Sequence, residues 1–321
     1  MANISKITIG GVTYDIEDGE ARRILQLQSG GLGVSEGSNL EEVFADEIAA
    51  THGLDQEAKK WNWIRQRIRN SNFAGLFVGD YIPFTISQGD VSLKAEIAGI
   101  NTYKNYGDTG FEVGNHIDFI TRDCHPAETR FNIANFNNGT TVSPAPWLSS
   151  ELYAKLNNLQ MQVPSVAGAT PTLITADFRS NGVYGTLPSA LRDVIVQKRA
   201  LIPRRHSAGV LLIDDTSWGW ADIGYLWIPS EMEVYGTNVW GSLVPATPGN
   251  SIGGFQQYPI FANNMKRVKH AGEGGPRSRW WLLSARGGSS THFCSVHSIG
   301  HANHDNASTA TLRVPLCFRI A

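Results

Sequence analysis

Residues Ser278 to Ile320 are the part of this sequence that is most informative about its fold. It opens with Ser-Arg-Trp-Trp-Leu-Leu-Ser-Ala at 278–285 and closes with Leu-Arg-Val-Pro-Leu-Cys-Phe-Arg-Ile at 312–320. Both pieces are apolar and aromatic, which is typical of buried strands. The run between them, 286–311, is rich in Gly, Ser, Thr, His and Asn and cannot form a core by itself. We therefore expect a polar loop that core strands hold at both ends, an arrangement typical of binding surfaces.

The polar run also has an unusual composition. From Arg286 to Arg313 there is no Lys, Glu, Gln, Met or Trp. Mutation of the two adenines of an Asn AAC codon cannot produce these five residue types. The types that it can produce, among them His, Ser, Thr, Ile, Asp, Arg and Gly, fill the run. This bias suggests that part of the run is encoded by codons of that kind.

Three motifs in the same stretch carry a resemblance to a known family. They are Trp280-Trp281-Leu282-Leu283-Ser284-Ala285, Phe293-Cys294-x-Val296-x-x-x-Gly300-x-Ala302-Asn303 and Asn306-Ala307-Ser308. Together they resemble the variable region of proteins diversified by retroelements in gut phages. The resemblance implies a C-type-lectin-like domain related to the fold of the formylglycine-generating enzyme. The chain departs from the family at Leu312-Arg313-Val314-Pro315, where the family more often has Gly-Val-Arg-Pro.

In that family, mutable positions alternate with a fixed framework. The resemblance implies framework roles for Phe293, Cys294, Val296, Gly300, Ala302, Asn303, Asn306, Ala307 and Ser308. It implies that the variable, ligand-binding side chains are Arg286, Thr291, His292, Ser295, His297, Ser298, Ile299, His301, His304, Asp305, Thr309 and Thr311. We expect these side chains to point into water, with a few of them, such as Arg286, His292, Ile299 and His301, supplying most of the affinity.

Composition and charge exclude several classes of protein. The 321 residues allow one large domain or two modest ones. A net charge of −2 argues against sequence-independent nucleic-acid binding, which needs a basic surface. The sequence has no run of about 18 apolar residues, so we expect no membrane insertion. Residues 1–5 lack the basic start and apolar core of a secretory signal.

The three cysteines, Cys124, Cys294 and Cys317, form neither a CxxC metal motif nor a disulfide framework. We expect buried free thiols, and a Cys294–Cys317 bridge between neighbouring strands is the alternative. Enzymatic relatives of the implied fold use a cysteine pair near the C-terminus. An oxidase resembling the formylglycine-generating enzyme therefore stays open, although a reactive thiolate needs exposure and nearby positive charge.

The N-terminal segment predicts a small independent unit. Apolar residues alternate on either side of Gly10-Gly11, which indicates a two-residue hairpin, and 17–28 has a helical pattern. Residues 1–29 resemble the short N-terminal segment of many phage virion proteins, which implies an attachment or oligomerisation device. A plain hairpin packed on the main domain is the alternative. We assign 30–54 as a linker with a short helix and 55–321 as the lectin-like domain, with its variable region at about 280–320.

Helix signals occur at several points. Asn39 is a candidate N-cap for a helix that starts at Leu40. A second helix is predicted over 55–69, with Trp61, Ile64 and Ile68 on one face. We expect its basic residues Lys59, Arg65, Arg67 and Arg69 to lie mostly on a solvated face. Further helices are predicted after Ser149 or Ser150, over 188–196, and after the Pro-Ser-Glu turn at 229–231.

Strand signals begin near residue 80. Candidate strands cover 81–86, 93–100 and 116–120, and two of them alternate cleanly between apolar and polar residues. A fourth candidate, 225–228, runs into the Pro-Ser-Glu turn. Together with the helix signals, these strands predict an α+β fold with short twisted antiparallel strands, flanking helices and many loops.

Two clusters of residues, one of histidines and one of aspartates, are candidates for a metal site. His292, His297, His301 and His304 lie close in sequence beside Asp305, which could suggest zinc or nickel. We favour contact residues instead, because metal sites need ligands that a second shell of hydrogen bonds holds in place. Asp214-Asp215 fits a turn with Asp caps, and calcium is the alternative. Our prediction includes no metal and no cofactor.

The sequence thus predicts non-enzymatic ligand recognition. We expect a phage receptor-binding protein or host-surface adhesin that contacts a host cell-surface protein or glycan. Several copies would gain avidity, so a homotrimer is expected, and the N-terminal segment would contact other virion proteins. The protein would be made in the bacterial cytoplasm without a signal peptide and act on the virion, outside the cell. The alternative is a structural virion component, such as a head fibre, decoration or tail-plate protein, in which the domain only packs.

Overall fold

The structure is a computed structural model that describes residues 6–9, 12–15, 37–140, 143–168, 170–207, 210–211, 217–241 and 256–321. These residues form an α+β fold, and every pair of hydrogen-bonded strands among them is antiparallel. The predicted fold class is confirmed at this level. None of the helices in these ranges has the length and hydrophobicity needed to span a bilayer.

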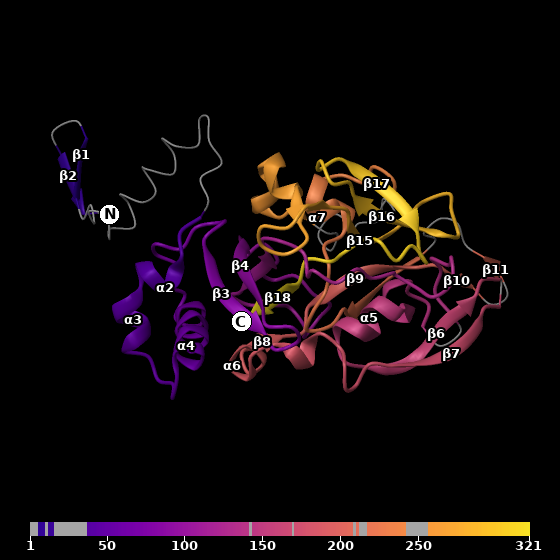
Figure 1. Ribbon diagram of the computed structural model, residues 1–321, viewed down its shortest axis with the longest axis horizontal. Helices are drawn as coiled ribbons and strands as arrows, with labels where there is room; N and C mark the ends of the chain where they lie inside the picture. Colours follow the sequence, from indigo (N-terminus) through magenta and orange to yellow (C-terminus); the bar gives the residue numbers. More distant parts are fainter. Residues whose placement is uncertain are drawn as a thin grey trace.

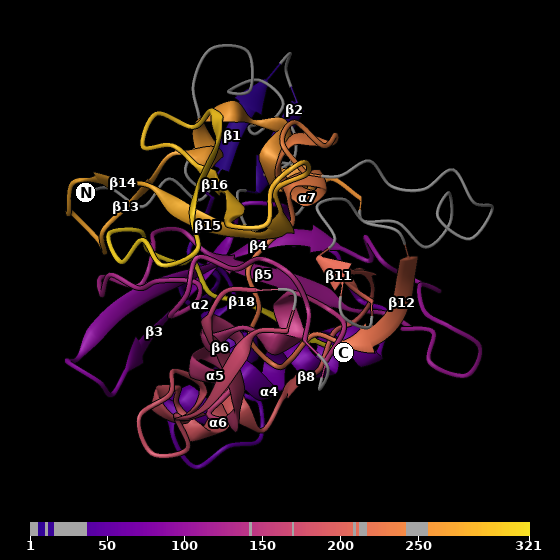
Figure 2. The same ribbon diagram turned by 90° about the vertical axis from the view of Figure 1, so that its right-hand side faces the viewer.

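A five-stranded sheet forms the centre of the molecule. Its order is β3-β4-β5-β18-β8, with bounds Tyr81–Ile86, Val91–Ile100, Ile117–Thr121, Cys317–Ile320 and Ile195–Val196. Every residue of β5 and β18 is buried, because both faces of the sheet are covered. Figures 1 and 2 show α4 on one side of this sheet and the sheet formed by β15, β16 and β17 on the other.

Three N-terminal helices pack beside this sheet. They are α2 (Leu40–Val43), α3 (Ala45–Ala49) and α4 (Gln56–Arg69). The Asn39 side chain accepts a hydrogen bond from the Glu41 amide, and Asp55 caps α4 in the same way by accepting from Ala58. These caps satisfy amides that the helix itself cannot. The predicted starts of α2 and α4 are therefore confirmed, whereas α3 begins at a position that the sequence did not predict.

The apolar face of α4 packs as predicted, but one of its basic residues does not. Trp61 meets the rings of Phe84 and Phe318 edge-on, at centroid distances of 6.2 and 6.1 Å. Arg67 was expected on a solvated face, yet it is buried and pairs with Glu47 at 2.8 Å. The reason is the packing of α3 against α4, which places a carboxylate beside the guanidinium. Ile48 of α3 also belongs to the core.

Several predicted elements occur with altered bounds. Ser150 caps α5 (Glu151–Leu156), which follows the 3-10 helix η1 (Trp147–Ser149). The helix predicted over 188–196 ends early: α6 covers only Ser189–Arg192, because the chain then enters the central sheet as β8. The fourth predicted strand is reduced to a single bridge between Trp227 and Cys317.

The remaining elements are short hairpins and turns. The two-residue hairpin near the N-terminus is confirmed, because Ile9 pairs with Val12. The helix predicted over 17–28 and the predicted turn at Asp214-Asp215 lie outside the described residues. The other elements are β1 (Lys6–Ile9), β2 (Val12–Asp15), β6 (Gln160–Val166), β7 (Thr172–Asp177), η2 (Tyr184–Thr186), β9 (Arg199–Arg204), β10 (His206–Ser207), β11 (Val210–Leu211), β12 (Ser217–Asp222), η3 (Pro259–Ala262), η4 (Asn264–Arg267), β13 (Lys269–His270) and β14 (Arg277–Ser278).

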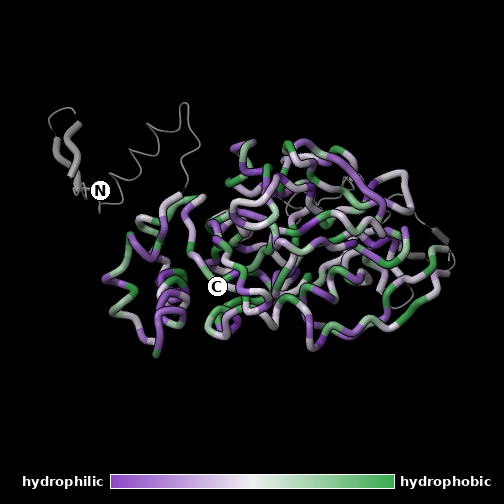
Figure 3. The backbone as a smooth tube through the Cα atoms, viewed as in Figure 1, coloured by the Kyte–Doolittle hydropathy of each residue, from purple (hydrophilic) through white to green (hydrophobic). Residues whose placement is uncertain are grey.

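The C-terminal stretch forms a three-stranded sheet of order β15-β16-β17, with bounds Trp280–Ala285, His292–Val296 and Ala302–Asn306. The expectation of one polar loop over 286–311 is therefore wrong, since two strands lie inside it. Phe293 and Val296 bury apolar side chains there, while β17 is hydrophilic after its first residue, Ala302, as Figure 3 shows. Helix α7 (Glu231–Tyr235) packs against β15.

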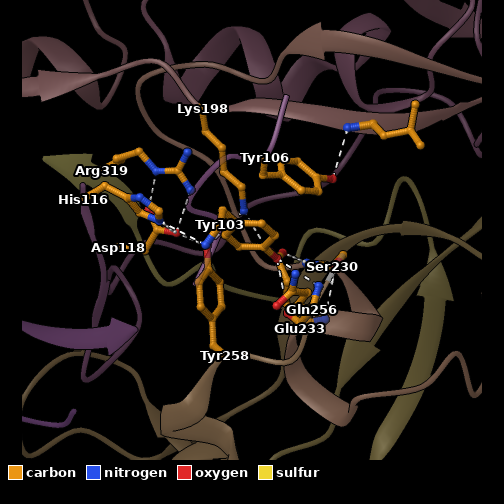
Figure 4. Close-up of polar contacts among 11 residues, drawn as sticks. Tyr103, Tyr106, His116, Asp118, Lys198, Ser230, Glu233, Gln256, Tyr258 and Arg319 are labelled. Atoms are coloured by element: carbon orange, nitrogen blue, oxygen red, sulfur yellow. Dashed lines mark hydrogen bonds and ion pairs between the residues drawn. The ribbon is translucent and has the colours of Figure 1, made fainter. Parts of the chain in front are cut away.

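Figure 4 shows a buried ionic network beside the central sheet. Arg319 of β18 lies opposite Asp118 of β5, and its guanidinium donates two hydrogen bonds to the carboxylate, at 2.7 and 2.8 Å. Burial raises the pKa of Asp118, but the charge and the hydrogen bonds of Arg319, with smaller contributions from His116 and Lys198, together outweigh burial and lower that pKa to about 2. The pair is thus fully ionised inside the fold.

The same network ties α7 to the sheet. Lys198 pairs with Glu233, and the Tyr103 hydroxyl donates to the same carboxylate at 2.7 Å. Tyr258 links the two halves, because its hydroxyl donates to Asp118 at 2.9 Å and accepts from Lys198 at 2.9 Å. Each of these five side chains is at most 1% exposed, so each charge depends on its partners.

One histidine completes the network in its neutral form. The Nε2 atom of His116 accepts from the Tyr103 amide at 3.1 Å, and Nδ1 lies 2.9 Å from the Gly114 carbonyl, to which it donates. Burial lowers the pKa of His116 to about 4. Protonation of Nε2 would remove the acceptor that Tyr103 uses, so the fold favours the neutral ring.

Candidate binding surface

The candidate ligand-binding residues fall into three groups on the C-terminal sheet. The first group surrounds a pair of histidines. His292 lies opposite Asn306 and Cys294 opposite His304, so His292 and His304 share one face of the sheet. Their ring centroids are 5.1 Å apart. Arg286 and Thr291 border this pair, and the Thr291 hydroxyl lies 2.7 Å from His292 Nδ1.

Trp240 joins this group, although sequence reasoning did not single it out. Its ring meets His304 edge-on at 4.7 Å, and the Arg286 guanidinium lies 5.6 Å from its centroid. The side chain is 39% exposed. The sequence offered only a weak signal, an aromatic residue in the polar segment 236–241. Exposed aromatic side chains beside arginine are enriched where proteins bind each other.

A buried carboxylate holds Trp240 in place. Glu231 is fully buried, and its side chain accepts hydrogen bonds from the amides of Val239, Trp240 and Gly241 at 2.8, 3.0 and 2.8 Å. Burial raises the pKa of Glu231, while the three amides favour its ionised form. The segment that carries Trp240 is therefore fixed to the start of α7 by hydrogen bonds to a charged group.

The second group forms the turn between β16 and β17. The rings of His297 and His301 stack with centroids 4.4 Å apart and planes within 7°. Between them, Ile299 is 61% exposed and Ser298 is half-buried. Gly300 has φ +90° and packs on Val268, so the turn needs glycine there, as its implied framework role requires.

The third group lies on the opposite face of β16 and β17. Ser295 donates to Asp305 at 2.7 Å, and Arg279 donates to the same carboxylate and, at 3.3 Å, to Thr311. Ser295 is fully buried, which corrects the expectation that every variable side chain points into water. Its partner Asp305 is only half-buried, Thr311 is exposed, and Thr309 is half-buried.

The framework positions are buried to different degrees. Phe293, Cys294, Val296 and Ala307 are fully buried, and the Phe293 ring stacks on Phe131 at 3.5 Å. Other implied framework residues are half-buried or exposed, namely Ala302, Asn303, Asn306 and Ser308. The buried framework therefore lies mainly in β16 and at the end of the hairpin, whereas β17 forms its outer edge.

Side chains from segments that are distant in the sequence hold the loop between β15 and β16 in place through hydrogen bonds. Arg205, which is fully buried, donates to the carbonyls of Arg286 and Ser289 at 3.1 and 2.9 Å. The Asn137 side chain donates to the carbonyls of Arg286 and His292. The backbone beneath the first group is thus held by the core, while its side chains face outward.

The histidines of this surface are not arranged as a metal site. No cluster of three or more His, Cys, Asp or Glu side chains suited to a metal ion occurs within the described ranges. Burial, followed by the charge of Arg286, lowers the pKa of both His292 and His304. Both rings therefore favour the neutral form at pH 7, in which one ring nitrogen donates and the other accepts; Nδ1 of His292 already contacts Thr291, and Nδ1 of His304 is buried.

The three cysteines are free and buried, as predicted. Burial raises the pKa of Cys317 well above its usual value and the pKa of Cys124 to about 12. Cys294 and Cys317 form no disulfide. All three thiols lack the exposure that thiolate chemistry needs, and the raised pKa values of Cys124 and Cys317 disfavour their thiolate forms.

Comparison of the chain with protein-family models, with curated proteins and with solved structures finds no match. Function is therefore inferred from the geometry of this surface. From here on, the "candidate surface" means the part of the three groups that faces solvent together with Trp240: Arg286, Thr291, His292, His297, Ser298, Ile299, His301, His304, Thr309, Thr311 and Trp240.

Proposed function

We propose that this chain is a non-enzymatic recognition protein of a phage particle, in which a C-type-lectin-like domain presents the candidate surface to a host cell-surface protein or glycan. The variable positions named from the sequence supply the contacts, and the identity of the ligand changes with them. A homotrimer gains avidity when its copies engage together. The N-terminal hairpin segment joins the protein to other virion proteins.

One observation supports this proposal above the others. Chemically diverse side chains, some exposed and some half-buried, extend from a backbone that buried residues hold in place. Ile299 and Trp240 expose apolar area, His292 and His304 offer hydrogen bonds, and Arg286 adds charge. A rigid scaffold that carries adaptable side chains limits the entropy lost on binding.

Binding to bacteria tests the proposal. The fluorescently labelled full chain is mixed with a panel of bacterial strains, and bound label is measured by flow cytometry. We expect at least one strain to bind, and the triple variant Trp240→Ala, His292→Ala, His304→Ala to lose most of that binding. Arg179→Ala is the matched control, because it removes an exposed side chain that follows β7 and lies outside the candidate surface. Equal binding by both variants would contradict the role of the candidate surface.

The neighbouring genes give a second test. We expect a reverse transcriptase gene nearby, with a near-copy of the DNA that encodes 280–320 and adenines at the variable codons. Their absence would count against diversification. If purified phage particles contain the protein but no strain binds it, the alternative of a structural virion component is favoured. Sedimentation of the purified chain measures whether it is a trimer.

A further inference from the structure

A cavity of about 300 Å³ lies where the turn between β3 and β4, the segment 125–129 and helix α5 meet. It shares no residue with the candidate surface. Its walls are mainly apolar and include Val91, Leu152, Leu156, Val183 and Val314. This volume is at the lower end of the range of about 300–1,000 Å³ found for small-molecule sites.

His125 lines the cavity with an unused donor. The side chain is only 8% exposed. Its Nδ1 accepts from the Ala127 amide at 3.1 Å, so the neutral ring carries its proton on Nε2. That Nε2 is buried and has no hydrogen-bond partner among the described residues. Burial also lowers the pKa of His125 to about 4, which keeps the ring neutral at pH 7. A buried donor without a partner is unfavourable unless a ligand or water completes it.

Lys155 of α5 lines the same cavity and lacks a counter-ion. Its ammonium donates to the Thr129 hydroxyl at 3.2 Å, but no ion pair joins it to a carboxylate in the described part of the chain. The acidic neighbour Glu151 already accepts two hydrogen bonds from Arg130, at 2.7 and 3.1 Å. Burial lowers the pKa of Lys155, as expected for a cation with incomplete compensation.

We propose that this cavity binds a small monocarboxylic acid with a short apolar body. The carboxylate would accept hydrogen bonds from Lys155 Nζ and His125 Nε2, and the apolar body would lie against Val91, Leu152 and Leu156. One cation and one neutral donor match a single negative charge. A phosphate, with up to two charges, would lack a second cation, and a sugar would leave its hydroxyls against apolar walls. This inference does not rest on the proposed function.

Calorimetric titration of the full chain at pH 7 with hexanoate and with hexan-1-ol tests the proposal, because the two probes differ only in their head groups. We expect hexanoate to bind at least tenfold more tightly than the alcohol. Lys155→Met keeps the apolar stem and removes the charge, so it should abolish that difference and leave alcohol binding unchanged. Lys104→Met, an exposed lysine outside the cavity, is the matched control and should behave like the parent chain.

A second variant separates loss of the site from loss of the fold. Ala127 is an exposed residue that lines the cavity, so Ala127→Phe should fill it and abolish binding of both probes while the melting temperature stays close to that of the parent. Three results would overturn the proposal: equal affinity for acid and alcohol, no saturable binding of either probe, or unchanged hexanoate affinity in Lys155→Met.

Discussion

The buried network around Asp118 and the candidate surface around His292 are both polar, yet they are built in opposite ways. In the network, each charge has a dedicated partner, as in the two hydrogen bonds between Arg319 and Asp118. On the candidate surface, the side chains meet mainly through ring contacts, such as that between His292 and His304, and face solvent. The network therefore constrains which residues the fold accepts, whereas the surface leaves its side chains free to change.

Breaking the network should have the largest effect. Arg319→Met leaves the Asp118 carboxylate buried without its main partner, so we expect a loss of about 3–5 kcal/mol in unfolding free energy, measured by urea denaturation. Arg179→Met is the matched control, because Arg179 also binds a carboxylate, that of Asp177, through two hydrogen bonds, but at the surface. It should leave stability almost unchanged. Equal losses for the two variants would contradict the distinction.

Acid should weaken the network through His116. The pKa of His116 is about 4 in the folded chain, against an ordinary histidine pKa of 6.5 in the unfolded chain. As the pH falls, the unfolded chain therefore binds the proton first. The contribution of the neutral ring to the free energy of unfolding is fully present above pH 6.5. This contribution, roughly 3 kcal/mol, is lost as the pH falls from 6.5 to about 4. Urea denaturation at several pH values measures this loss. His116→Asn should reduce it, and His52→Asn, an exposed histidine, should not.

Glu231 belongs to α7, which joins the network to the candidate surface, and its substitution should cause an intermediate loss of unfolding free energy. Glu231→Gln replaces one carboxylate oxygen with a donor that faces backbone amides, so we expect a loss of about 1–3 kcal/mol. Hydrogen exchange of the amides of Val239, Trp240 and Gly241 should become faster, because all three donate to Glu231. Unchanged exchange at these amides would show that the carboxylate does not position Trp240.

Local signals in the sequence predicted local structure well. Strand β3 begins and ends where the alternation of apolar residues predicts, and the caps at Asn39 and Ser150 follow from short polar side chains before helical patterns. Such features depend on residues within a few positions of one another. They needed no knowledge of the rest of the chain.

Features that depend on distant partners escaped prediction. Strand β17 consists of an alanine followed by polar residues, and it forms because it pairs with β16, which packs Phe293 on Phe131 from the first half of the chain. The network joins Lys198 to Glu233, and no sequence pattern brings such residues together. Ser295 looked like its polar neighbours, and only the register shows that it is buried.

Substitutions on the candidate surface should have the smallest effect on stability, and they test most directly whether its side chains are replaceable. In one variant, the exposed and half-buried variable residues become Asn, except Asp305, which accepts hydrogen bonds from Ser295 and Arg279: Arg286, Thr291, His292, His297, Ser298, Ile299, His301, His304, Thr309 and Thr311. Single surface substitutions usually change stability by less than about 0.5 kcal/mol. We expect a melting temperature within a few degrees of that of the parent chain, whereas Ser295→Asn alone should lower it more. A lost or strongly lowered transition in the multiple variant would contradict a replaceable surface on a fixed framework.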